Sequence, residues 1–334
     1  MQNLSLDRTE DILVRCKGNQ IAVLGDIMLD RYFWGSVSRI SPEAPVPVID
    51  IDSESYHLGG AANVANNLIS LGLKPLLCGL LGNDNTGKTF IEIAENSGID
   101  TGGMFIDPQR PTTVKTRIIG NNQHIARLDR ESLEQITSEG ENHIISYLNS
   151  NKNISGIIFS DYNKGTLSDY LIGEIISFGR INQIPIYVDP KFDNFFSYKK
   201  ATVIKPNRKE ASQALGFTIK NSEDVVKAGR QICERLNCQY VLITLGKDGM
   251  MLIESNGNLF SAETQARNVS DVSGAGDTAI SALSAAVSGG ATMLEAAAIA
   301  NFASGAVCEQ PGIVPITSEA LKSAIKRYNM NMII

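Results

Sequence analysis

The side chains best suited to chemistry stand at positions 268–278, where Gly274, Ala275 and Gly276 come directly before Asp277. A turn of small residues that opens a helix presents backbone N–H groups and the positive end of the helix dipole, which together bind a phosphate or a developing anion. A carboxylate beside such a site repels phosphate, unless its task is to take a proton from an attacking hydroxyl. The plain alternative is a glycine-rich turn before a core helix.

A second glycine-containing segment needs a different interpretation. Residues 82–89 read Gly-Asn-Asp-Asn-Thr-Gly-Lys-Thr and match the spacing of a nucleotide-binding P-loop. The backbone N–H groups of a P-loop bind anions, so Asp84 within the loop would oppose a triphosphate. We therefore expect an ordinary strand-to-helix turn there.

The composition is that of an ordinary soluble protein, with 334 residues of which 43% are hydrophobic and 20% are charged. A formal net charge of −6 argues against a nucleic-acid partner but not against an anionic substrate. Five scattered cysteines and three unpaired histidines predict neither disulfides nor a zinc site. We find no signal-peptide-like segment and no apolar run of about 18 residues, so we expect a cytoplasmic protein without a membrane span.

Short apolar strands alternate with helix-like segments along most of the chain. The expected strands fall at 21–25, 75–81, 156–160, 184–188, 202–205 and 240–244. This alternation predicts an α/β protein with a mostly parallel central sheet. Ligands of such sheets bind beyond the carboxyl ends of the strands. Polar side chains gather at those ends: Asp26, Asp30, Asp161, Asp189, Lys191, Asn207, Glu210 and Thr244.

Two segments break the alternation. Residues 33–57 carry three prolines and short β-like pieces, and residues 112–129 read as a hairpin that turns at Gly120-Asn121-Asn122. Together they predict a small antiparallel β lid beside the main part of a single domain, 1–334. A small sheet packed on one side leaves an apolar face or an open edge, which predicts a homodimer joined through the lid.

Five short motifs occur in the order typical of one family. They are Gly-Asp-Ile-Met-Leu-Asp at 25–30, His-Leu-Gly-Gly-Ala-Ala-Asn-Val-Ala at 57–65, Asn-Arg-Lys-Glu at 207–210, Thr-Leu-Gly-Lys-Asp-Gly at 244–249 and Asp-Val-Ser-Gly-Ala-Gly-Asp at 271–277. Over almost its full length the chain resembles the PfkB, or ribokinase-like, sugar kinases. The resemblance implies a ribokinase-like three-layer α/β/α fold and ATP-dependent phosphoryl transfer to a sugar hydroxyl.

The resemblance implies a role for each residue of the Gly-Ala-Gly-Asp turn. Asp277 would deprotonate or orient the attacking hydroxyl, and the N–H groups of Gly274, Ala275 and Gly276 would stabilise charge on the phosphoryl group. Asp271 matches a position that often helps to hold a monovalent cation such as K⁺.

Nucleotide binding is implied for a further set of positions. ATP would meet Thr244, Gly246, Gly249 and Asn301, while Asn207 and Glu210 would organise Mg²⁺ and its waters. For Asn207 and Glu210 a helix cap with its partner is an open alternative. For Asn301 the alternative is an amide on a helix surface.

Sugar hydroxyls would meet Asp30, Gly60 and Asn63, although Asn63 could instead cap the helix that follows it. A phosphate at the far end of the substrate requires cations. The candidates are Lys115, Arg117, Arg127 and Lys191. Strand alternation places Lys115 and Arg117 on one face. A solvated cationic face is the alternative for each.

Further segments, at 31–35, 41–47, 115–117, 127–129 and 189–191, resemble the D-glycero-β-D-manno-heptose 7-phosphate kinases of that family. The resemblance implies phosphorylation of O1 on the route to the ADP-heptose of lipopolysaccharide. Some of these kinases are fused to an adenylyltransferase with a His-x-Gly-His motif that this sequence lacks, so we expect adenylyl transfer to belong to another chain. The alternatives are a kinase for fructose 6-phosphate, tagatose 6-phosphate or a nucleoside, and a non-catalytic sugar-phosphate sensor on the same fold.

Overall fold

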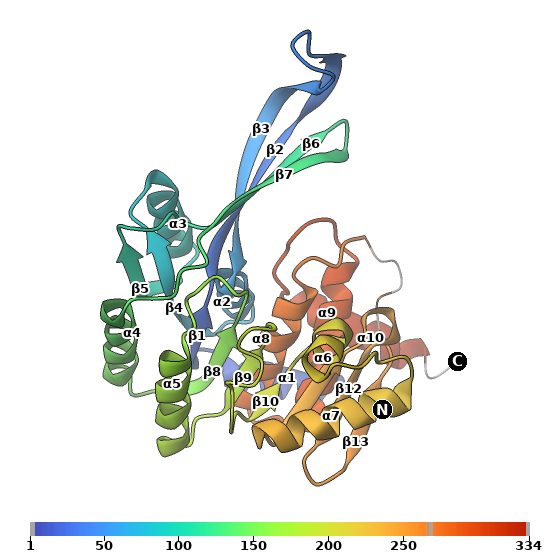
Figure 1. The fold of residues 1–334 in the computed structure, drawn as a ribbon. Coiled ribbons are helices and arrows are strands. Elements are labelled where there is room, and N and C mark those ends of the chain that lie inside the picture. The colour runs from blue at the N-terminus through green and yellow to red at the C-terminus, as the bar shows by residue number, and fades with distance from the viewer. Residues whose placement is uncertain (1–3, 265, 267–269, 332–334) are drawn as a thin grey trace.

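The computed structural model describes residues 4–264, 266 and 270–331. Its main body is built on a nine-stranded sheet with the strand order β13-β12-β11-β10-β9-β8-β1-β4-β5 (Figure 1). The strands are β1 (Gln20–Gly25), β4 (Lys74–Gly82), β5 (Asp100–Asp107), β8 (Ile154–Ser160), β9 (Ile186–Asp189), β10 (Val203–Ile204), β11 (Tyr240–Thr244), β12 (Met250–Glu254) and β13 (Leu259–Ala262). All neighbours from β11 to β5 are parallel, while β12 and β13 add an antiparallel edge.

Helices cover both faces of this sheet. One face packs against α1 (Leu6–Cys16), α2 (Ala61–Ser70), α3 (Asn85–Asn96), α8 (Ala275–Ser288), α9 (Met293–Cys308) and α10 (Ser318–Asn331). The other packs against α4 (Ser138–Ser150), α5 (Asp169–Ile181), α6 (Arg208–Leu215) and α7 (Ser222–Leu236). Strand β1 serves both cores, because Ile21 and Val23 face the first group of helices while Ala22 and Leu24 face the second. The predicted three-layer α/β/α fold is confirmed.

A second sheet has the order β3-β2-β6-β7 and projects from the main body (Figure 1). Its strands, called the lid from here on, are β2 (Ile27–Ile40), β3 (Pro47–Gly60), β6 (Val114–Gly120) and β7 (Gln123–Arg130). The two hairpins, β2–β3 and β6–β7, are antiparallel as predicted. The central pair β2–β6 is parallel, because each strand leaves the body after a strand of the parallel sheet and runs outward.

The lid begins closer to the core than the sequence predicted. The first four residues of β2 are buried, and a single residue separates this strand from the end of β1. Asp30 therefore belongs to a lid strand rather than to the end of β1. This continuity places the inner part of the lid beside the carboxyl ends of the main strands.

The P-loop-like segment is a strand-to-helix turn, as expected. Asp84 caps α3 and accepts a hydrogen bond from the N–H of Gly87 at 2.8 Å. It also accepts from Thr112, through the backbone N–H at 3.1 Å and the hydroxyl at 2.8 Å. A carboxylate of the chain itself thus already binds an N–H group at this helix start.

Within the described residues, no helix combines the length and the apolar character that a bilayer crossing requires.

Candidate active site

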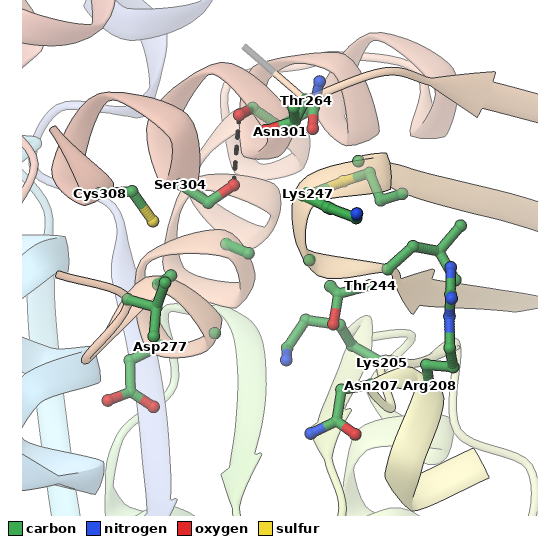
Figure 2. Close-up of a pocket in the computed structure, with 18 of the residues that line it drawn as sticks. Lys205, Asn207, Arg208, Thr244, Lys247, Thr264, Asp277, Asn301, Ser304 and Cys308 are labelled. Carbon is green, nitrogen blue, oxygen red and sulfur yellow. Dashed lines mark hydrogen bonds between the residues drawn. The ribbon is translucent and has the colours of Figure 1, made fainter. Parts of the chain in front are cut away.

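A cavity of about 730 Å³ lies between the N-terminal turn of α8, the inner face of α9 and the carboxyl ends of β9, β10 and β11. Figure 2 shows Asp277 and Cys308 on one side of it and Lys205, Asn207 and Thr244 on the other. The position agrees with the general rule that ligands of a parallel sheet bind beyond the carboxyl ends of its strands.

The turn before α8 forms one wall. Gly274 is the N-cap with a φ of 78°, and no side chain caps this helix end. The N–H of Ala275 already donates to the carbonyl of Val272 at 3.3 Å. Gly276 lies next to a cation, because a Cβ added there would come within 3.4 Å of Lys205 Nζ. The helix N-terminus and Lys205 together provide a positive site for an anion.

Asp277 lies at the bottom of this wall and is only 5% exposed. Its Oδ1 accepts a hydrogen bond from the Tyr162 hydroxyl at 2.6 Å, and its Oδ2 accepts one from Asn63 Nδ2 at 2.7 Å. Burial, and then the charge of Asp189, raise the pKa of Asp277 to about 6, while the two hydrogen bonds and Lys205 oppose that rise. A carboxylate with this pKa is mostly ionised at neutral pH and can accept a proton.

Lys205 and Asp189 form a buried ion pair with an Nζ to Oδ1 distance of 3.0 Å. Their side chains are only 3% and 10% exposed. The sequence placed Asp189 at a strand end but treated Lys205 merely as the last residue of an apolar strand. A lysine directly after such a strand, before Pro206-Asn207, was the sequence signal that could have identified Lys205 as a site residue.

The predicted nucleotide residues line the same cavity. Gly249 follows a short 3₁₀ turn, Gly246–Asp248, with a φ of 86°, and a Cβ there would lie 2.0 Å from the carbonyl oxygen of Ala262. Only glycine fits this close approach. Asn301 is buried in α9 and donates to the carbonyl of Glu263 at 2.7 Å, so the surface-amide alternative is wrong.

Asn207 and Glu210 form a capping box at the start of α6. Asn207 Oδ1 accepts from the N–H of Glu210 and Glu210 Oε2 from the N–H of Asn207, both at 2.8 Å. The helix-cap alternative is therefore confirmed, and it coexists with a place in the cavity wall. Lys191 forms an ion pair with Glu210 Oε1. Lys191 Nζ also lies 5.3 Å from the ring centroid of Tyr162.

The candidate sugar residues lie towards the lid. Asn63 is buried within α2, where its amide holds Asp277, so the alternative that it caps this helix is wrong. The N-cap is Gly60. Asp30 forms an ion pair with Arg117, whose guanidinium lies 5.1 Å from the ring centroid of Tyr32. The predicted carboxylate for a sugar hydroxyl and a predicted phosphate ligand are thus direct partners.

The lid cations share one face. Lys115 and Arg117 are two residues apart on β6, and Arg127 stands opposite Arg117 in the strand register. Asp30 lies on the same face, opposite Lys115. Lys115 Nζ lies 4.0 Å from Asp129, and Arg127 forms two hydrogen bonds with the same carboxylate at 2.9 and 3.0 Å. Each candidate therefore has an acidic partner in this structure. Lys191 lies apart from the other three, in the wall of the cavity.

Asp271 lies on the loop before α8. Its Oδ1 accepts from the N–H of Ser273 at 2.8 Å, and its own N–H donates to the carbonyl of Cys308 at 3.3 Å. Residues 267–269, which precede it, lie outside the described part of the chain.

A helix N-terminus that can hold an anion, with a buried carboxylate beside it, suits the transfer of a phosphoryl group. The chain belongs to the pfkB family carbohydrate kinases, whose family profile matches residues 19–319. It is an ATP-dependent sugar kinase.

Curated relatives agree with this family. The chain is 42% identical over 291 residues to "Bifunctional protein HldE" of Geobacter sulfurreducens, covering 87% of this chain and 59% of the relative. It is 40% identical over 317 residues to the protein of the same name from Helicobacter hepaticus, covering 95% and 66%. The chain thus spans roughly three fifths of the length of these relatives.

Solved structures share the fold at low sequence identity. Phosphofructokinase-2 from Escherichia coli in complex with potassium aligns with a TM-score of 0.76 at 16% identity, over 94% of this chain and 99% of that one. Arabidopsis thaliana ribokinase complexed with ribose and ATP aligns with a TM-score of 0.72 at 19% identity, over 92% and 99%. The ribokinase-like fold is confirmed.

Proposed function

We propose that this kinase phosphorylates O1 of D-glycero-β-D-manno-heptose 7-phosphate to the 1,7-bisphosphate, for ADP-heptose and lipopolysaccharide core synthesis. The observation that carries the proposal is the cationic lid face around Arg117, which lies beside Asp30 and suits a sugar that already bears a phosphate. The roughly 40% identity to proteins named HldE supports it.

The proposed reaction uses the groups around the α8 turn. Asp277 takes the proton of the O1 hydroxyl while that oxygen attacks the γ-phosphorus of ATP, and the bond from the γ-phosphorus to the bridging oxygen breaks to release ADP. Each oxygen of Asp277 already accepts one hydrogen bond and keeps a further lone pair for the proton. The N–H of Gly276 and the ammonium of Lys205 stabilise charge on the transferred group.

ATP is expected to lie along the cavity from Gly276 towards Asn301, in contact with Asn207, Thr244, Gly246 and Gly249. Mg²⁺ fits a site of this kind, because Glu210 offers one carboxylate at the cavity wall and Mg²⁺ keeps several water and phosphate ligands. Among the described residues, no three acidic, histidine or cysteine side chains are grouped to hold a metal, which agrees with a metal that arrives with ATP. When bound, Mg²⁺ neutralises phosphate charge. K⁺ at Asp271 stays a prediction.

The sugar is expected between the lid and Asp277. Asp30 accepts a hydrogen bond from a sugar hydroxyl, and the backbone at Gly60 and the amide of Asn63 complete the sugar site. Lys115, Arg117, Arg127 and Lys191 are the proposed ligands of the distant phosphate. Closure of the lid over the cavity excludes water and so limits hydrolysis of ATP.

A panel of substrates in an assay coupled to ADP release tests the proposal. The expected result is the highest kcat/KM with heptose 7-phosphate, and a much lower value with unphosphorylated heptose. A higher kcat/KM with fructose 6-phosphate, tagatose 6-phosphate or a nucleoside would assign a different pfkB activity. Binding of a sugar phosphate without ADP release would point to a sensor.

We also propose a homodimer that forms through the lid. Alternation along β2 puts Arg31 and Phe33 on the face opposite to Arg117. Strand register adds Tyr56 and Leu128 and, beyond an irregularity in the β2–β3 pairing, Ile51 opposite Gly35. Ile51 and Leu128 are 57% and 55% exposed. The lid therefore has one charged face for substrate and one partly apolar face, which a second copy would cover.

A further inference from the structure

Tyr162 lies on the loop that follows β8 and is a direct hydrogen-bond partner of Asp277. Its hydroxyl donates to Asp277 Oδ1 at 2.6 Å, and its side chain lines the cavity. We propose that Tyr162 is a positioning residue for the proposed base, and that Asp26 holds the Tyr162 loop in place. The inference rests on the proposed role of Asp277 as the base.

Asp26 organises the loop by accepting three backbone hydrogen bonds. Its Oδ2 accepts from the N–H groups of Tyr162 at 2.7 Å and Lys164 at 3.0 Å, and its Oδ1 accepts from Thr166 at 3.1 Å. Asp26 is 1% exposed. These bonds run to a segment about 140 positions further along the chain.

The loop is fixed from two more sides. Asp161 accepts from the N–H of Asn163 at 2.9 Å and from the Tyr198 hydroxyl at 2.7 Å. The buried Arg110 donates to the carbonyl of Lys164 at 2.8 Å. The loop backbone is thus held by the carboxylates of Asp26 and Asp161 and by the guanidinium of Arg110. The loop therefore presents the Tyr162 hydroxyl in one place, as a positioning residue requires.

Several charged groups surround the hydrogen-bonded pair of Tyr162 and Asp277. Asp189 and Lys191 approach from the end of β9, Lys205 from the residue after β10 and Asp30 from β2, while Asn63 comes from α2. Burial, and then the charge of Asp277, raise the pKa of Tyr162 well above its ordinary value. Tyr162 therefore remains a donor at working pH and favours the ionised form of Asp277.

Tyr162→Phe tests the inference, because it removes only the donated hydroxyl. The expected result is a rise of about one pH unit or more in the midpoint of the acid limb of the kcat profile. At pH 6 we expect kcat to fall about fivefold or more, with most of the loss recovered by pH 9 and the KM for ATP unchanged. An acid limb at the parent pH, or an equal loss at every pH, would overturn the inference.

Tyr187→Phe is the matched control. Tyr187 is fully buried in β9, and its hydroxyl has no hydrogen-bond partner among the described residues. Removing it should leave the acid limb where it is. A shift equal to that of Tyr162→Phe would mean that any lost tyrosine hydroxyl produces the effect.

Asp26→Asn tests the proposal that Asp26 holds the Tyr162 loop in place. The amide can no longer accept all three N–H groups, so the acid limb should move in the same direction. In a Tyr162→Phe background it should cause no further shift, because Asp26 acts through Tyr162. An additional, independent shift would contradict the link. Asp277→Asn separates the proposed role of Asp277 from the proposed role of Tyr162. An active Asp277→Asn enzyme would refute the assignment of Asp277 as the base. An inactive one would support that assignment, and the Tyr162 variants then decide the second proposal.

Discussion

Lys205 Nζ lies 3.0 Å from Asp189 Oδ1 in a pair that is almost completely shielded from solvent. Removing one member of a buried ion pair leaves an uncompensated charge, which typically costs about 3–5 kcal/mol. The same lysine stands beside Gly276, where the proposed reaction places negative charge. The pair thus joins folding stability to phosphoryl transfer.

Lys205→Met should therefore lower both the free energy of unfolding, by about 3–5 kcal/mol, and kcat. It should also move the acid limb of kcat upward, because Lys205 lowers the pKa of Asp277. The double variant Lys205→Met/Asp189→Leu should recover much of the stability but none of the activity. Urea denaturation and steady-state kinetics measure the two effects. Recovery of kcat in the double variant would show that Lys205 acts only on stability.

Asp277→Asn should reduce kcat by about 10²–10⁴-fold, since an amide cannot accept the proton of the attacking hydroxyl. Binding of ATP should change little, because the nucleotide residues lie further along the cavity. Calorimetric titration with a non-hydrolysable ATP analogue, beside the kinetic assay, distinguishes loss of chemistry from loss of binding. A near-normal kcat would refute the assignment of the base.

The pKa of Asp277 also predicts how stability depends on pH. Its value in the folded chain, about 6, lies above the ordinary 3.8. A carboxyl with a raised pKa contributes most below its unfolded value, and this contribution disappears as pH rises through 6. The loss amounts to at most about 3 kcal/mol.

Asp277→Asn, which has no such titration, should therefore gain stability relative to the parent between pH 4 and pH 8. Denaturant titrations at both pH values give the comparison. A difference between the two proteins that is the same at pH 4 and pH 8 would rule out this account.

Arg117→Met should raise the KM for heptose 7-phosphate by about 10–100-fold, because a charge-assisted hydrogen bond contributes about 1.5–3 kcal/mol. The KM for ATP should stay constant, and the preference over unphosphorylated heptose should shrink. Arg39→Met, which removes an exposed cation from the outer end of β2, is the control. Equal effects of both substitutions would favour the solvated-face interpretation of the lid cations.

The lid interface can be tested by light scattering at micromolar concentration. The chain has a mass of 36.1 kDa, and we expect about twice this mass for the parent. Ile51→Glu and Leu128→Glu should shift the mass towards the monomer by placing charge on the apolar lid face. Ile181→Glu, at an exposed position at the end of α5, should not. A parent mass of 36 kDa that is independent of concentration would exclude the dimer.

Local patterns were enough to predict the alternating body and the turn before Asp277. The glycines, the carboxylate and the helix that follows are adjacent in sequence, so their chemistry can be read in one place. Strand β5 and the antiparallel edge, β12 and β13, were not predicted. They are short or begin with weak patterns such as Asp100-Thr-Gly-Gly, and they become strands by pairing with a sheet edge that already exists.

Tyr162 shows what local patterns miss. It reaches Asp277 across 115 positions of sequence, and nothing about an Asp-Tyr-Asn-Lys loop marks its tyrosine as special. The pairing of Asp30 with Arg117 has the same origin, because it depends on the parallel register of β2 and β6. Such contacts follow from topology, which the order of the motifs indicates but does not resolve to single partners.

Strand β2 runs from buried residues near Met28 to an exposed end at Ile40, so a small rotation at its buried base would be amplified at its tip. At about 3.3 Å per residue, a rotation of about 10° at Met28 would carry Ile40 through about 7 Å. Asp30 lies only two residues from Met28 and would scarcely move. Wide travel at the tip is thus compatible with a fixed position of the proposed sugar ligand Asp30. Transferring this lid to another protein would require part of the core as well.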